Sequence, residues 1–136
     1  MTIEKLVPET ANENFTKILS NNKIVICLYH WKMCSHCILF KPVWNQVANK
    51  YKNDLMITDI ELDAMRHLQP QHMVQMFPSI IVYKNGRKSI EYDKRREAPE
   101  LDSFMKSFIN EYKPAKPVKA QKKPSKKKPS KPKGKK

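Results

Sequence analysis

The chain has 136 residues, about the size of one domain, and 40% of them are hydrophobic, which is enough apolar surface for a single packed core. Its formal net charge of +14 is unevenly distributed, because residues 1–112 carry 15 basic and 13 acidic side chains whereas residues 113–136 carry 12 lysines and no acid. The N-terminus lacks the apolar run of a secretory signal and no segment is long enough to span a bilayer, so we expect an intracellular protein, cytoplasmic or nuclear, that has no membrane partner.

The first predicted elements are a helix, a buried strand and a second helix. Phe15 and Leu19 have the spacing of one helix face. Residues 24–29 form a short, β-branched apolar run that is typical of a strand buried on both faces. From residue 34 to about residue 51, apolar side chains recur every three or four positions around Pro42. This pattern predicts a helix that is kinked at the proline, because proline removes a backbone donor.

The following segment predicts a second strand, a weak helix and a hairpin. Residues 55–62 alternate apolar and polar side chains, and residues 64–75 have a weaker helical pattern that is broken by a proline. Residues 79–84 and 87–92 predict two strands joined by Asn-Gly, which is the strongest short signal for a hairpin.

The last predicted element is a helix over residues 99–112, which begins with Pro99 and carries one apolar stripe. The order of the elements predicts an α/β fold, with a central mixed sheet and helices on both faces. Beyond Tyr112 the sequence has 5 prolines, few apolar residues and unbalanced charge, so it cannot bury enough surface to offset its ordering entropy. We therefore expect one domain over residues 1–112 and a disordered, Lys/Pro-rich tail over residues 113–136.

Two of the three cysteines, Cys34 and Cys37, lie where the buried strand gives way to the helix with Pro42. Amides and the helix dipole at a helix start stabilise an anion, so we expect the Cys34 thiol to ionise near neutral pH, with His36 adding to the effect when protonated. A zinc site is the alternative for this spacing, but there is no second cysteine pair and the histidines lack zinc-finger spacing. We expect no metal and no cofactor besides the dithiol itself. Cys27, inside the apolar strand, is expected to be a core residue.

At these positions the chain resembles the thioredoxin superfamily. The resemblance is carried by Cys34-Ser35-His36-Cys37, by Pro42 five residues later, by Phe77-Pro78-Ser79 before an apolar strand, and by Lys84-Asn85-Gly86. It implies a thioredoxin fold and a thiol–disulfide oxidoreductase that acts on protein thiols or disulfides, with an electron donor such as a reductase or glutathione.

The resemblance also implies roles for individual residues. Pro78 would be a cis-proline beside the cysteine pair, where the backbone pairs with the substrate in a groove lined by Trp31, Met33 and Phe77. A histidine before the second cysteine is similar to protein disulfide isomerases, and Arg96 resembles an arginine that tunes the second cysteine. The alternative for Arg96 is a solvated cation at the start of a helix.

The sequence departs from the family at the residues that handle the proton of the resolving cysteine. The buried acid of the central strand falls at Leu28, and the lysine of the neighbouring strand falls at Asp59. Either Asp59 replaces the missing acid from across the site, or it is a solvated aspartate at a strand edge. A glycine that the family has in its last strand is replaced near Lys94. We expect this replacement to reshape the substrate groove.

Two other functions fit the same sequence: a redox-inactive thioredoxin-like adaptor, and a protein that associates with nucleic acid through its tail. The tail has no aromatic residues for base stacking, so its lysines favour non-specific contact with nucleic acid or acidic surfaces. A solvated tail without a partner is the alternative. Packaging in a virion is a further alternative if the source is a large DNA virus. The lysines that we assign to polyanion binding are Lys122, Lys123, Lys126, Lys127 and Lys128.

The direction of catalysis stays open at this point. Ser35 and His36 favour an oxidase or isomerase, because they raise the reduction potential, whereas the apparent lack of an export signal favours a reductase.

We predict that the tail is separable from the redox chemistry. A chain that ends at Tyr112 should fold and turn over like the full chain, because it keeps every predicted core element. It should lose a salt-dependent attraction to duplex DNA whose log–log slope is about −5 if half of the 12 tail lysines neutralise phosphates. DNA binding of both chains across a salt series measures this, and equal binding would place the basic surface in the domain.

Overall fold

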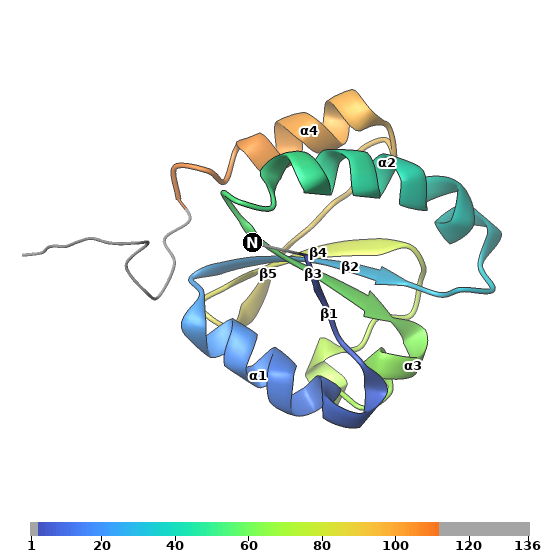
Figure 1. Cartoon of the computed structure of the whole chain (residues 1–136), viewed down its shortest axis with the longest axis vertical. Coiled ribbons are helices and arrows are strands. Elements are labelled where there is room, and N and C mark those ends of the chain that lie inside the picture. The colour runs from blue at the N-terminus through green and yellow to red at the C-terminus, as the bar shows by residue number, and fades with distance from the viewer. Residues whose placement is uncertain (1–2, 112–136) are drawn as a thin grey trace, which may run out of the picture.

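The computed structural model describes residues 3–111 and shows one five-stranded sheet with helices on both faces (Figure 1). The elements in chain order are β1 (Glu4–Lys5), the 3-10 turn η1 (Pro8–Thr10), α1 (Ala11–Asn21), β2 (Ile24–His30), α2 (Ser35–Tyr51), β3 (Met56–Glu61), α3 (Leu62–Met65), the 3-10 turn η2 (Pro70–His72), β4 (Ser79–Lys84), β5 (Arg87–Glu91) and α4 (Ala98–Lys106). The α/β thioredoxin fold expected from the sequence is confirmed. Tyr112 and the expected tail lie outside the described residues.

The strands lie in the order β1-β3-β2-β4-β5, so β2 is central. β1 and β2 both run parallel to β3, whereas β4 is antiparallel to β2 and to β5. In Figure 1, α2 and α4 cover one face of the sheet, and α1 and α3 cover the other. Within residues 3–111, none of the helices has the length and apolar composition needed to cross a membrane.

β2 divides two cores because its side chains alternate between the two faces. Ile24, Ile26 and Leu28 pack in the core beneath α2 and α4, whereas Cys27 and Tyr29 pack in the core beneath α1 and α3. Every residue of β2 before His30 is buried. The apolar run of the sequence is therefore a strand covered on both faces, as expected, and Cys27 is a core residue.

The Asn-Gly hairpin is present with the backbone that its residues favour. Asn85 has φ 54° and Gly86 has φ 82°, which are the two left-handed positions of a tight type I′ turn. The turn joins β4 to β5, and the pairing shifts register between Val82 and Tyr83.

Two sequence-based predictions need correction, and one strand was missed. The weak helix over residues 64–75 is instead the four-residue α3 and the turn η2, because Pro70 starts a new turn rather than continuing a helix. α4 ends at Lys106, and the chain continues through turns in which Phe108 remains buried, with its N–H bonded to the Met105 carbonyl at 3.1 Å. β1 was not predicted, because two residues are too few to give a periodic pattern.

We predict that Leu101, in the core beneath α2 and α4, contributes strongly to stability, whereas Leu39 does not. Leu101 is 0% exposed in α4, whereas Leu39 is 75% exposed on α2. Leu101→Ala should lower the free energy of unfolding by about 2–5 kcal/mol, because it leaves a cavity. The same change at Leu39 should stay within about 0.5 kcal/mol of the parent. Urea denaturation of both variants measures the difference, and equal losses would contradict this account of the core.

Candidate active site

Cys34 occupies the cap position at the start of α2. Its backbone is extended, with φ −91° and ψ 120°, and its carbonyl accepts the first helical bond from the Ile38 N–H at 3.0 Å. Its Sγ accepts a hydrogen bond from the Cys37 N–H at 3.3 Å. The sulfur of Cys34 therefore faces the free amides of a helix start, as the sequence predicted. Both cysteines are in the free thiol form.

The two thiols have opposite environments. Cys37 is 2% exposed, whereas Cys34 is only half-buried. Partial burial alone would raise the pKa of the Cys34 thiol, but hydrogen bonds from Cys37 and from the amides of Cys37 and His36, together with the charge of Arg96, lower it below its usual value. Burial, followed by the hydrogen bond to Cys34, raises the pKa of the Cys37 thiol to about 11. The thiolate therefore forms preferentially at Cys34.

The Phe77–Pro78 segment lies against Cys34. The peptide bond between these residues is cis, as the resemblance implied for Pro78. The Cys34 thiol donates to the Phe77 carbonyl at a distance of 3.6 Å between sulfur and oxygen. The Ser79 hydroxyl donates to the Met76 carbonyl at 2.6 Å and fixes the turn before β4. The carbonyl of Phe77 thus lies beside the Cys34 thiol.

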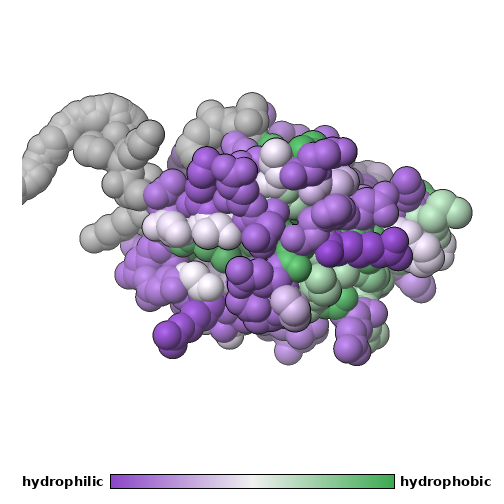
Figure 2. Space-filling model, turned by 90° about the horizontal axis from the view of Figure 1, so that it is seen from below, coloured by the Kyte–Doolittle hydropathy of each residue, from purple (hydrophilic) through white to green (hydrophobic). Residues whose placement is uncertain are grey.

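Apolar side chains are exposed around this thiol. Trp31 and Met33, which precede Cys34, are 39% and 71% exposed, and Phe77 is half-buried. In Figure 2, polar residues cover most of the face and apolar residues gather toward the right-hand end, where β2 leads into α2 in Figure 1. The predicted groove residues are therefore brought together near Cys34.

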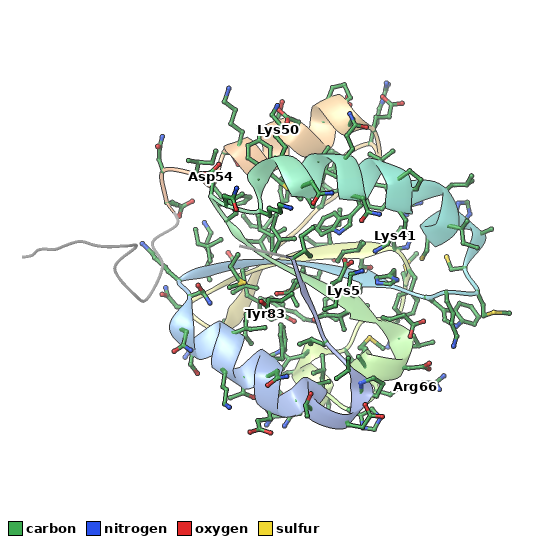
Figure 3. The ribbon with its side chains drawn as sticks, viewed as in Figure 1. Lys5, Lys41, Lys50, Asp54, Arg66 and Tyr83 are labelled. Carbon is green, nitrogen blue, oxygen red and sulfur yellow. The ribbon has the colours of Figure 1, made fainter. Side chains whose placement is uncertain are left out.

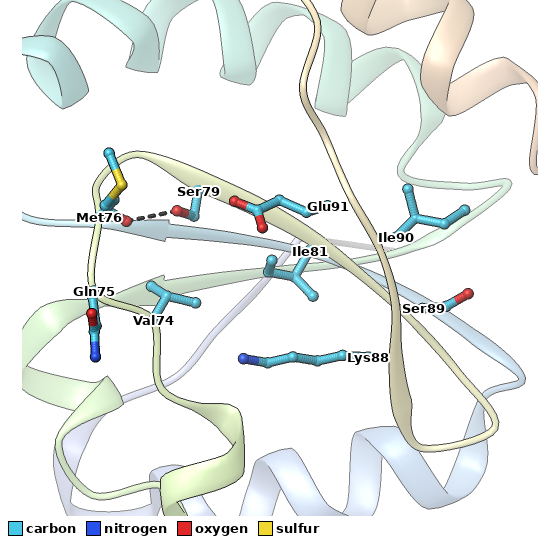
Figure 4. Close-up of a pocket in the computed structure, with 9 residues that line it drawn as sticks. All are labelled: Val74, Gln75, Met76, Ser79, Ile81, Lys88, Ser89, Ile90 and Glu91. Carbon is cyan, nitrogen blue, oxygen red and sulfur yellow. Dashed lines mark hydrogen bonds between the residues drawn. The ribbon is translucent and has the colours of Figure 1, made fainter.

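The sequence analysis missed three exposed apolar residues in the same region: Ile38, Leu39 and Met76. Met76 also lines a pocket of ≈ 460 Å³ between β5 and the segment before β4, shown in Figure 4, where Ile81 lies between the side chains of Lys88 and Glu91. Exposure of bulky apolar side chains cannot be deduced from composition, because it depends on which helix face the fold covers.

Arg96 and His36 are the two side chains expected to influence the cysteine pair, and both are exposed. Arg96 is exposed, lines a small pocket of ≈ 250 Å³ with Pro78 and Lys94, and its charge lowers the pKa of both thiols. His36 is exposed in the first turn of α2, and its backbone N–H contributes to the Cys34 site.

Asp59 is not the solvated strand-edge residue that the sequence left as an alternative. It is 4% exposed in β3, next to Leu28 of β2, and its Oδ2 accepts a hydrogen bond from the Lys41 Nζ at 2.8 Å. The sequence analysis missed Lys41, although a lysine between Cys37 and Trp44 on the buried side of a predicted helix was a usable signal. A charge that faces a core needs a partner, and Asp59 provides it.

The five tail lysines assigned to polyanion binding, from Lys122 to Lys128, lie outside the described residues, so the structure adds nothing to that assignment.

The sequence matches one family model and several known proteins over most of its length. The thioredoxin family model matches residues 6–107. Protein disulfide isomerase-like 2-1 of rice is 35% identical over 109 residues, which are 78% of this chain and 28% of that protein. Protein disulfide-isomerase 2-3 of Arabidopsis thaliana is 29% identical over 99 residues, which are 73% of this chain and 22% of that protein. The chain thus spans less than a third of the length of these relatives.

Solved structures share the fold at low sequence identity. The J-Trx1 fragment of ERdj5 has a TM-score of 0.68 at 20% identity and covers 79% of this chain and 52% of that one. Human ERp44 in its zinc-bound form has a TM-score of 0.65 at 17% identity and covers 79% of this chain and 32% of that one. Because the family model spans residues 6–107 and the structure has the corresponding sheet and helices, this chain belongs to the thioredoxin family.

Proposed function

We propose that the chain is a protein thiol–disulfide oxidoreductase in which Cys34 attacks and Cys37 resolves. The observation that carries the proposal is the difference between the two thiols: Cys34 is accessible and has a lowered pKa, whereas Cys37 is buried and has a pKa of about 11. Since the thiolate is the nucleophile in exchange, an accessible thiol that ionises readily is suited to the first attack.

In the reducing direction, the Cys34 thiolate attacks one sulfur of a substrate disulfide. The substrate S–S bond breaks, the leaving sulfur takes the electron pair and a proton, and a mixed disulfide remains on Cys34. Cys37 then loses its proton and attacks the Cys34 sulfur, which releases the second substrate thiol and forms the Cys34–Cys37 disulfide. Two electrons pass to the substrate, and the reverse sequence oxidises a dithiol.

Other residues support this exchange in the proposal. The backbone at Phe77 and Pro78 holds the polypeptide, and Trp31 and Met33 contact it. Asp59 accepts the proton of Cys37, and His36 and Arg96 tune the pair.

The proposed partners are protein thiols or disulfides, with a reductase or glutathione as electron donor, and no cofactor is needed besides the dithiol. The intracellular location and the contact of the basic tail with polyanions remain parts of this proposal. The redox-inactive adaptor is the weaker alternative, because both cysteines of the pair are present as free thiols and the Cys34 thiol bonds the Phe77 carbonyl.

We predict that the two cysteines are not interchangeable. Cys34→Ser should abolish reduction or oxidation of a test protein disulfide, because the nucleophile is lost. Cys37→Ser should accumulate mixed disulfides, because the second attack cannot occur. Turnover assays and mass spectrometry of acid-quenched reactions distinguish the variants. Equal residual activity in both would refute the assigned order.

We predict that His36 raises the reduction potential of the pair. His36→Pro should lower the potential by tens of millivolts, because a protonated histidine favours the Cys34 thiolate and therefore the reduced form; ~30 mV corresponds to ~1.4 kcal/mol for two electrons. Equilibration of both proteins in glutathione buffers gives the potentials. An unchanged value would mean that the exposed imidazole has no influence on the pair.

A further inference from the structure

A small pocket of ≈ 250 Å³ lies next to the cysteine pair, on the face of the sheet that α2 and α4 cover. Its apolar and aromatic lining residues come from α2, from β4 and from the chain on either side of these two strands, and they are Phe40, Pro78, Ile80 and Tyr92. The pocket is close to the reacting sulfur, because the carbonyl of Phe77, the neighbour of Pro78, lies 3.6 Å from the Cys34 Sγ. Successive Cα atoms are about 3.8 Å apart, so a side chain next to a substrate cysteine can reach this pocket.

The other lining residues of the pocket are charged. They belong to the exposed segment between β5 and α4, which reads Asp93-Lys94-Arg95-Arg96-Glu97. Asp93, Lys94 and Arg96 line the pocket. The charge of Arg96 also acts on both thiols of the pair, which places this end of the segment beside the reacting sulfurs. The pocket thus combines apolar side chains with two cations and one acid.

Tyr92 fixes the backbone of this charged segment. Its N–H donates to the Ile80 carbonyl at 2.9 Å, and its hydroxyl donates to the Arg95 carbonyl. Its ring contacts that of Phe104 in α4 edge to face, with 4.8 Å between the ring centroids. The cations are therefore carried by a backbone that is anchored to β4 and α4.

The cations of this segment lack the acidic partners that other lysines have. Lys41 and Lys50 of α2, which Figure 3 labels, each bond an aspartate at 2.8 Å. Within the part of the chain that the structure describes, Lys94, Arg95 and Arg96 form no ion pair, and neither do the two acids that flank them. Their N–H groups are therefore available to an anion that comes from outside the chain.

We propose that this pocket selects protein substrates that carry a glutamate next to the reacting cysteine, with the carboxylate bound by Lys94 and Arg96. This inference rests on the proposed exchange function and adds a substrate class to it. The volume is below the roughly 300–1,000 Å³ of most small-molecule sites, so it suits one side chain. The methylene groups of a glutamate pack on the apolar lining, and the two cations favour a carboxylate over a neutral amide.

The test compares synthetic cyclic peptides that are closed by one disulfide and that carry either Glu or Gln, in turn, at each position beside a cysteine. Reduced full chain in excess consumes each peptide at low ionic strength, and the loss of the peptide disulfide is followed after acid quenching. At one or more positions the Glu peptide should react about two- to five-fold faster than its Gln partner, which is the range of an exposed ion pair. The preference should disappear in 1 M salt, where the screening length is about 3 Å.

Variants at Lys94 show whether the pocket causes this preference. Lys94→Gln should at least halve the ratio of the Glu rate to the Gln rate, and Lys94→Glu should abolish or reverse it. Taking the ratio within one variant cancels any change in the reactivity of Cys34. Lys23→Gln and Lys23→Glu are the matched controls, because Lys23 is also exposed and unpaired within residues 3–111 but precedes β2, at the end of the strand remote from Cys34. These controls should keep the parent ratio.

Three results would overturn the proposal. The parent could show a ratio of one at every position, or Lys94→Glu could leave the ratio unchanged. Equal losses in Lys94→Glu and Lys23→Glu would mean that only the net charge of the chain matters. Failure of the parent to consume either peptide would instead contradict the proposed exchange function itself.

Discussion

The position of Cys34 depends on the burial of β2 between two helical layers. Six consecutive residues, from Ile24 to Tyr29, are fully buried, so the strand can neither slip nor turn without exposing one of the two cores. The chain leaves the sheet at His30, and α2 begins at Ser35. Cys34 is therefore held at a helix start, where amides face its sulfur, by a strand that contributes nothing to the chemistry itself.

The position of the two cysteines at the start of α2 gives their thiols different exposure and different pKa values. The same turn that exposes Cys34 turns Cys37 inward, where burial raises its pKa to about 11. A buried thiol with a high pKa resolves a mixed disulfide slowly unless a nearby base takes its proton. An ion pair between Lys41 and Asp59 joins α2 to β3. A buried ion pair adds little to stability, because its desolvation offsets its attraction.

The sequence predicted the central strand, the helix that carries the cysteines and the hairpin, because each has a strong local signal. Residues 24–29 are continuously apolar, the cysteine pair is followed by helical spacing, and the hairpin has Asn-Gly. Residues 64–75 were predicted wrongly because their helical pattern is weak and Pro70 starts a new turn. The two-residue strand β1 was missed because it exists only through its pairing with β3.

Within the site, the sequence predicted the cysteine pair, and the resemblance to the thioredoxin superfamily implied Pro78 and the groove residues. Neither could choose between the two roles of Asp59. That choice depends on burial and on a partner 18 positions away, which only the packing of α2 on β3 reveals. Lys41 was missed because a lysine on a helix is usually solvated, although its position between Cys37 and Trp44 on the predicted helix was a usable signal.

The central claim is that Cys34 and Cys37 form one reversible redox couple. Equilibration of the full chain in glutathione buffers of graded ratio, followed by thiol labelling and mass spectrometry, tests it most directly. The account predicts a single two-electron transition in which both thiols become protected together as an internal Cys34–Cys37 disulfide, while Cys27 remains a thiol. Persistence of both as free thiols across the whole series, or conversion of Cys34 alone to a stable glutathione adduct, would contradict it.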